Sequence, residues 1–97
     1  MMRDYEALIL LRPDLSDEGV DKEIKRLSQA ITNNNGQIIS FEKWAKRVLA
    51  YKVKKFKEGI YLLANFKIAP QMIKEIEKNW KLNENVLRVM VTVKGNK

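Results

Sequence analysis

The chain has 97 residues, of which 45% are apolar and 32% charged, a composition typical of one globular domain and not of a disordered basic tail. Its formal net charge is +7, and it contains neither cysteine nor histidine. This composition excludes disulfides, thiolate nucleophiles, imidazole bases and the usual zinc sites, and the sequence shows no nucleotide-binding motif or metal-ligand spacing, so we expect no cofactor or metal. The amino terminus passes directly into a strand pattern that leaves no room for a signal peptide, and no apolar run could span a membrane. We therefore expect a cytoplasmic protein with a single domain over residues 1–97.

The amino-terminal part predicts a strand followed by a helix. Residues 5–11 are rich in aliphatic side chains, and the Arg12-Pro13-Asp14 segment ends this strand. Ser16 fits the N-cap position of a helix that closes at the Asn- and Gly-rich residues 33–36. The apolar side chains of this helix recur at helical spacing and form one stripe: Val20, Ile24, Leu27 and Ile31.

The middle of the chain predicts two paired strands. A long strand covers residues 37–53, with an expected bulge near Trp44 and Ala45, and a third strand covers residues 59–68. A basic turn at residues 54–58 joins them, and strands this near in sequence favour an antiparallel hairpin.

The carboxy-terminal part predicts a second helix and a last strand. The helix opens at Ala69-Pro70, where the missing N–H of proline is harmless, and closes at residues 83–85. Its predicted buried stripe is Met72, Ile73, Ile76 and Trp80. The last strand covers residues 86–93, and its alternation places four apolar side chains on one face: Leu87, Val89, Val91 and Val93.

The order strand, helix, strand, strand, helix, strand indicates the fold class. Each β-α-β half requires a right-handed crossover, and the hairpin joins the two halves. The predicted fold is α+β, a ferredoxin-like split β-α-β sandwich with a four-stranded antiparallel sheet and both helices on one face.

The net charge is concentrated in one short segment. Between residues 43 and 57 there are seven basic residues and no acidic one, while basic and acidic residues balance in the rest of the chain. A localised excess of charge attracts a polyanion, and Trp44, Tyr51 and Phe56 are interleaved with the cations, which suits contact with nucleic-acid bases or sugars. The alternative is a solvated hairpin without a partner. The seven basic residues are Lys43, Lys46, Arg47, Lys52, Lys54, Lys55 and Lys57.

The predicted layout leaves one face of the sheet without helices, and strand alternation predicts what lies on it. If the residues on the helix side include Ile9, Ile60 and Val89, several large apolar side chains point the other way. Such a face favours a protein partner, although ordinary apolar surface is the alternative. The expected partner surface consists of Leu8, Leu10, Tyr61, Leu63 and Met90.

Two other functions occur on this topology. A stand-alone RNA-recognition domain would place stacking aromatics at positions that Ile60 and Leu62 occupy here, so its platform is missing. An acylphosphatase-like enzyme would use Arg12 and Asn65, but the segment around Arg12 has no glycine and Pro13 removes a backbone donor. Both remain alternatives to a structural RNA-binding protein.

The basic hairpin carries a recognisable motif. Residues 44–53 read WAKRVLAYKV, which resembles the signature of a bacterial ribosomal protein family, the sixth protein of the small (30S) subunit. The similarity continues through residues 2–6, 59–61 and 85–91, and so covers essentially the whole chain. Ala45 replaces the usual glycine and Val48 stands where a polar residue is common.

The resemblance implies a structural constituent of the small ribosomal subunit without catalytic activity. Members of that family bind the central domain of 16S ribosomal RNA jointly with the eighteenth small-subunit protein, as a heterodimer. By position in the motif, the expected RNA contacts are Lys46, Arg47, Lys52, Lys54 and Lys55, with Arg3 and Arg88 as weaker candidates.

Overall fold

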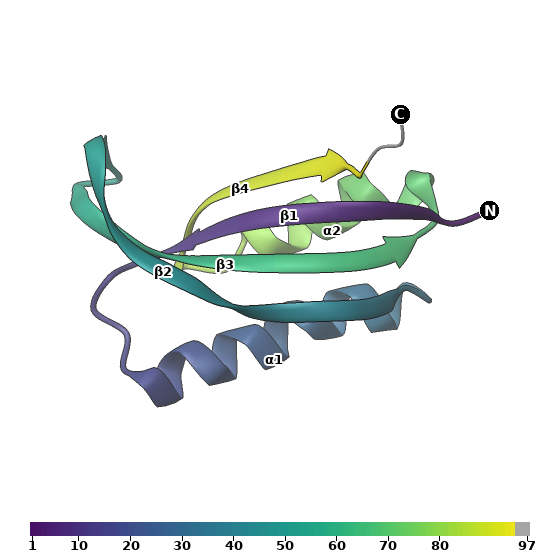
Figure 1. The fold of residues 1–97 in the computed structure, drawn as a ribbon, viewed down its shortest axis with the longest axis horizontal. Helices are drawn as coiled ribbons and strands as arrows, with labels where there is room; N and C mark the ends of the chain where they lie inside the picture. The colour runs from purple at the N-terminus through teal and green to yellow at the C-terminus, as the bar shows by residue number, and fades with distance from the viewer. Residues whose placement is uncertain (95–97) are drawn as a thin grey trace.

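The structure is a computed structural model that describes residues 1–94; the last three residues of the expected domain lie outside the described part. The strands form one antiparallel sheet in the order β2-β3-β1-β4, with both helices on one face (Figure 1). This arrangement confirms the predicted ferredoxin-like fold. Within residues 1–94, no helix is both long and apolar enough to span a membrane. The elements are β1 (Arg3–Leu11), α1 (Asp17–Asn33), β2 (Gln37–Val53), β3 (Phe56–Ile68), the short 3-10 helix η1 (Pro70–Met72), α2 (Ile73–Lys81) and β4 (Val86–Val93).

The core lies between the sheet and the two helices. The predicted helical stripes face it, because Leu27 of α1 and Ile76 of α2 are fully buried and Ile24 packs partly against the same cluster. Trp80 joins the two helices: its indole Nε1 donates a hydrogen bond to the backbone oxygen of Leu27 at 2.9 Å. The Trp80 ring also meets Phe66 of β3 edge-on, with ring centroids 6.1 Å apart.

A buried carboxylate ties the loop between α2 and β4 to α1. Glu23 accepts hydrogen bonds from the side-chain amides of Asn83 at 2.5 Å and Asn85 at 2.7 Å. The sequence pattern indicated only that these asparagines end the helix. It also reads Glu23 as a solvated charge on the helix surface, which is wrong because Glu23 is only 6% exposed. A carboxylate that is buried on the core-facing side of a helix requires such partners, since an unpaired buried charge would strongly destabilise the fold.

The hairpin between β2 and β3 is tighter than predicted. β3 begins at Phe56 and not at Gly59, so the turn consists of Lys54 and Lys55 alone. Both have positive φ, 48° and 77°, the conformation of a type I′ turn, which matches the twist of the flanking strands. The predicted bulge is confirmed, because the β2–β3 register shifts between Lys43 and Ala45 although Ala45 is not glycine.

The predicted alternation along β4 is wrong at the start of the strand. Leu10 pairs with Arg88 but Leu11 pairs with Val86, so Leu87 is an extra residue in a bulge. Val86 consequently joins the core cluster, whereas Leu87 is buried outside it. Beyond the bulge, Val89 and Val91 pack against the core as expected.

Leu10 lies on the predicted helix-free side of the sheet but is not exposed. Only 1% of its surface is accessible, yet it is not a member of the core cluster between the sheet and the helices. It lies between Tyr61 and Arg88 in the sheet, and its side chain occupies the space that a Cβ atom at Gly59 would need. The expectation that Leu10 contacts a partner is therefore corrected: it supports the base of the hairpin.

Gly59→Ala should destabilise the fold, because the new methyl group would overlap the Leu10 side chain within a well-packed region. We expect the free energy of unfolding to fall by about 1–3 kcal/mol in urea titrations. Gly19→Ala is the control, since a Cβ there meets only ordinary contacts at 3.4 Å or more in a helix. It should raise stability by about 0.5–1 kcal/mol. Equal effects of the two substitutions would contradict the packing of Leu10 against Gly59.

Candidate nucleic-acid interface

The basic hairpin, residues 43–57, projects beyond the rest of the sheet. β1 stops pairing with β3 at Ile60, while β2 and β3 continue together to the turn (Figure 1). The projecting end curls toward the helix-free face, because Ala50, Tyr51 and Val53 line a hollow of about 150 Å³ together with Tyr61 and Arg88. The curl brings Arg88 of β4 next to the hairpin. Arg88 and the hairpin cations can therefore belong to one surface.

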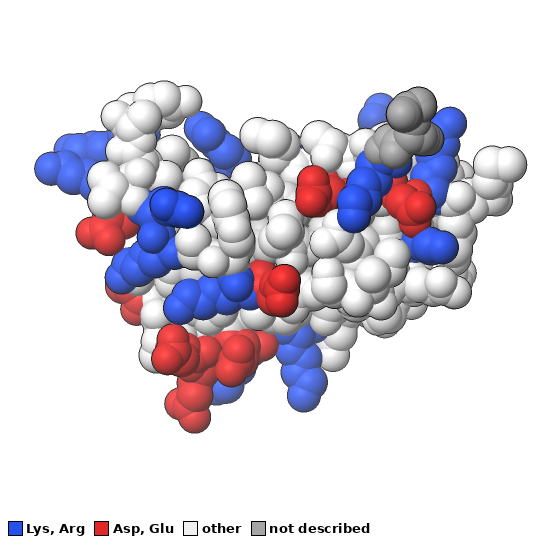
Figure 2. Space-filling model, in the orientation of Figure 1, with Lys and Arg blue, Asp and Glu red and all other residues white. Residues whose placement is uncertain are grey.

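The charges of the basic hairpin are largely free of intramolecular partners. Within residues 1–94, Lys43 is its one cation in an ion pair, 3.7 Å from Asp17 of α1. Figure 2 shows Lys and Arg side chains at the hairpin end and at the opposite end of this face, with acidic side chains concentrated below the hairpin end, over the start of α1. The unpaired charge therefore makes a field directed outward from the hairpin.

The cations occupy both sides of the hairpin. Cross-strand neighbours share a face, so Lys46, opposite Ile60, lies on the helix side, whereas Arg47, opposite Gly59, lies on the helix-free side. The guanidinium of Arg47 lies over the ring of Trp44, 5.5 Å from its centroid. A bound polyanion would therefore meet charge on both sides of the projection and at its turn.

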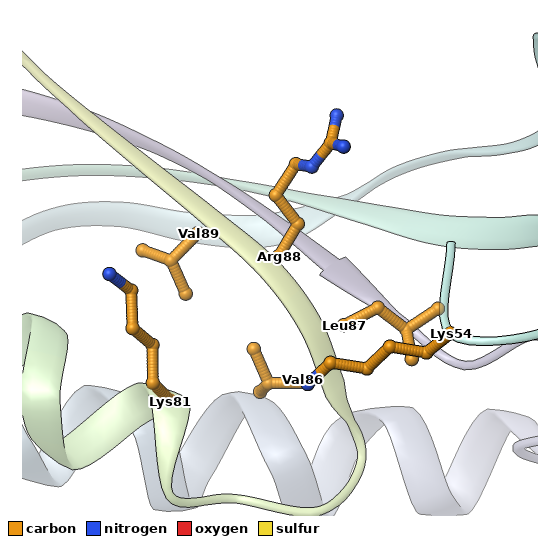
Figure 3. A pocket seen from close by; sticks show the side chains of 6 residues that line it. All are labelled: Lys54, Lys81, Val86, Leu87, Arg88 and Val89. Atoms are coloured by element: carbon orange, nitrogen blue, oxygen red, sulfur yellow. The ribbon is translucent and has the colours of Figure 1, made fainter. Parts of the chain in front are cut away.

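A second hollow extends the basic surface to the free edge of β4. It has a volume of about 320 Å³, and its lining comprises three cations, Lys54, Lys81 and Arg88, on a floor of valine and leucine. Figure 3 shows Lys54 and Lys81 approaching it from opposite sides, while Arg88 points away from them. The sequence did not indicate Lys81 as part of the site, because it lies far along the chain from the basic segment. A lysine in the last turn of a helix is common, since it interacts favourably with the helix dipole.

Arg12 contacts the basic hairpin beside its turn, at Phe56. Its guanidinium lies 5.3 Å from the centroid of the Phe56 ring and pairs with Asp14 at 2.8 Å. The hydrogen bond from Arg12 lowers the pKa of the Asp14 carboxyl below its usual value. Phe56, which the sequence suggested as a contact for bases, is half-buried beneath this cation and so acts as a support.

The residues of the acylphosphatase alternative are not brought together. Arg12 is engaged by Asp14, while Asn65 lies farther along the sheet and bonds to Ser40 and Lys94 at 3.1 and 2.9 Å. Across the described residues, no group of acidic side chains is placed to hold a metal ion. The structure thus assembles no phosphate-transfer site from these residues.

Arg3 lies away from the basic hairpin. It pairs with Ile68 at the far end of β3, in a molecule whose longest dimension is 39 Å. A surface centred on the hairpin therefore does not include Arg3.

The helix-free face carries the other predicted surface. Leu8 pairs with Leu63 on one side and with Met90 on the other, so the three side chains share this face as alternation predicts. They line a shallow hollow of about 250 Å³ with Glu6 and Thr92, and Met90 is 53% exposed. Tyr61 is half-buried at the hairpin side of the same face.

Comparisons with known proteins agree on one family. The family model described as ribosomal protein S6 matches residues 4–93. A small ribosomal subunit protein bS6 from Desulfitobacterium hafniense is 41% identical over 93 residues, covering 96% of this chain and 98% of the relative. The bS6 protein from Synechocystis is 40% identical over 90 residues, covering 93% of this chain and 80% of the relative.

Solved structures show the same fold. The 30S ribosomal protein S6 from Thermotoga maritima superposes with a TM-score of 0.88 at 25% identity, over 97% of this chain and 89% of that one. The carboxy-terminal domain of the MgtC protein from Mycobacterium tuberculosis superposes with a TM-score of 0.66 over 96% of this chain and 88% of its own. At 13% identity, this second likeness concerns the fold alone.

Proposed function

The chain belongs to the ribosomal protein S6 family, and we propose that it binds the central domain of 16S ribosomal RNA as a heterodimer with the eighteenth small-subunit protein. Family membership makes it a protein of the small ribosomal subunit, in the cytoplasm, and confirms that it is not an enzyme. The RNA target, the partner and the residues that contact them are the proposal.

The observation that carries the RNA-binding proposal is the unpaired charge of the basic hairpin. The two lysines of the turn have positive φ, where glycine or asparagine is preferred, so the sequence places two charges at the tip of the hairpin despite a conformational cost. The projecting geometry lets phosphates approach from both sides of the hairpin. The proposed phosphate contacts are Lys46, Arg47, Lys52, Lys54, Lys55, Arg88 and, through the second hollow, Lys81.

The partner proposal rests on the helix-free face. Its large apolar side chains lie beside the basic hairpin, so one partner could cover the face while RNA contacts the hairpin. Phosphate contacts alone do not discriminate among RNA sequences, and the partner would supply the missing selectivity. The proposed partner surface consists of Leu8, Tyr61, Leu63 and Met90.

Removing hairpin charge should weaken RNA binding and flatten its salt dependence. A variant with Lys46, Arg47, Lys54 and Lys55 replaced by Gln should lower the slope of log K against log salt by about 0.7–0.9 for each phosphate that the protein no longer neutralises. Filter binding to the ribosomal central domain with its partner protein, over a salt series, measures this slope.

The matched control removes the same charge from the helix surfaces, at the exposed residues Lys22, Lys25, Lys74 and Lys78, each replaced by Gln. It should retain the parental slope, since net charge alone then changes. Equal slopes for the hairpin variant and the parent would identify the hairpin as a solvated face and remove the RNA assignment.

Selectivity for the cognate RNA should depend on the partner. The isolated chain should bind cognate and scrambled RNA alike, and adding the eighteenth small-subunit protein should produce a preference for the cognate RNA. Met90→Lys should abolish that preference, because it places a charge on the apolar surface to be covered.

Val93→Lys is the control for this substitution, since Val93 is similarly exposed on the same strand but lies opposite Tyr5, on the helix side. It should preserve the partner-dependent preference. If the chain alone prefers its cognate RNA as strongly as the pair does, it is a stand-alone RNA-binding module and the paired proposal is wrong.

A further inference from the structure

Trp44 is the extra residue of the bulge in β2. The β2–β3 register passes from Lys43 opposite Leu62 to Ala45 opposite Tyr61, which leaves Trp44 without a partner in the ladder. A bulge of this kind re-aims a side chain, and here the indole packs against Tyr61 on the helix-free face, with ring centroids 5.9 Å apart and planes inclined by 61°. Trp44 thus lies at the base of the basic hairpin with 54% of its surface exposed.

The two tryptophans of the chain have different surroundings. Trp80 is fully buried and its indole N–H bonds to Leu27, so it belongs to the core. Trp44 is 54% exposed, and the guanidinium of Arg47 lies over its ring. An exposed ring with an adjacent cation is the combination that single-stranded nucleic-acid sites use, stacking for the base and charge for the phosphate.

The charges around Trp44 give the site a direction. Glu42, opposite Leu63, is the last acidic residue before the basic hairpin and lies on the same face as Arg47. A phosphate backbone would be repelled on the Glu42 side and attracted toward Arg47 and the turn. Arg47 and the lysines of the turn favour a nucleic acid, and not an apolar protein segment, as the partner that packs on the exposed ring.

We propose that Trp44 stacks on an unpaired nucleobase of RNA, with Arg47 contacting the neighbouring phosphate. The inference rests on the proposed RNA-binding function and adds a contact to bases that this function does not require. Ile60 and Leu62 are buried toward the helices, so β3 offers no stacking surface at these positions. The exposed aromatic ring is instead that of Trp44, on the bulge of the neighbouring strand β2. Stacking accepts every base, which agrees with weak selectivity of the isolated chain.

The test compares a short single-stranded oligouridylate with an abasic oligonucleotide of the same length, at low salt. Trp44→Ala should weaken oligouridylate binding by about 5- to 150-fold, the usual range for one stacked base, and leave the salt slope unchanged because the charge of the protein stays the same. Trp44→Phe should restore most of the affinity. Arg47→Gln should instead lower the salt slope by about 0.7, the value for one phosphate of a single strand.

Tryptophan fluorescence gives a second readout, since Trp44 is exposed and Trp80 is not. Oligouridylate should quench the emission of the parent but not of Trp44→Ala, and the abasic strand should quench neither. Equal affinity of parent and Trp44→Ala, or equal binding of both strands, would overturn the stacking inference and leave phosphate binding intact.

Two further outcomes separate this inference from the function on which it rests. If neither strand binds the parent even at low salt, both the inference and the RNA-binding function are contradicted. If Trp44→Ala weakens binding of the partner protein but not of oligouridylate, Trp44 belongs to the partner surface and the inference is wrong.

Discussion

The surfaces of this protein depend on β3, the interior strand that pairs with both β2 and β1. Its inner residues Leu62 and Phe66 are buried in the core, its outer residues Tyr61 and Leu63 face away from the helices, and its first residues continue into the basic hairpin. One strand thus joins the rigid core to the charged projection. The buried inner residues of β3 fix its register against β2 and β1. That register in turn decides which side chains of the hairpin and of the helix-free face point outward.

Local patterns in the sequence predict much of this arrangement. Strand alternation placed Leu8, Leu63 and Met90 on the helix-free face, and spacing of three and four placed Leu27 and Ile76 in the core. The bulge at Trp44 also follows from its neighbourhood in the chain. These features depend on residues a few positions apart, where periodicity and turn chemistry decide the outcome.

The features that escaped prediction arise from contacts between distant segments. Leu10 is buried because Gly59 leaves room for its side chain and the hairpin curls beside it, and neither event is visible in the β1 sequence. Leu87 is an extra residue where the β1–β4 register shifts, and that shift appears only when β4 pairs with β1. Lys81 joins the basic surface only when α2 and the hairpin turn meet at β4. The residues of the candidate site were therefore predictable mainly where they lie within the hairpin itself.

The central claim is that RNA contacts the basic hairpin while protein covers the helix-free face. Crosslinking within a purified small ribosomal subunit, read out by mass spectrometry, tests both halves at once. We predict RNA crosslinks within residues 43–57 and at Lys81, and protein crosslinks beside Leu63 and Met90. RNA crosslinks concentrated on the outer surfaces of α1 and α2, with the hairpin unreacted, would contradict the account.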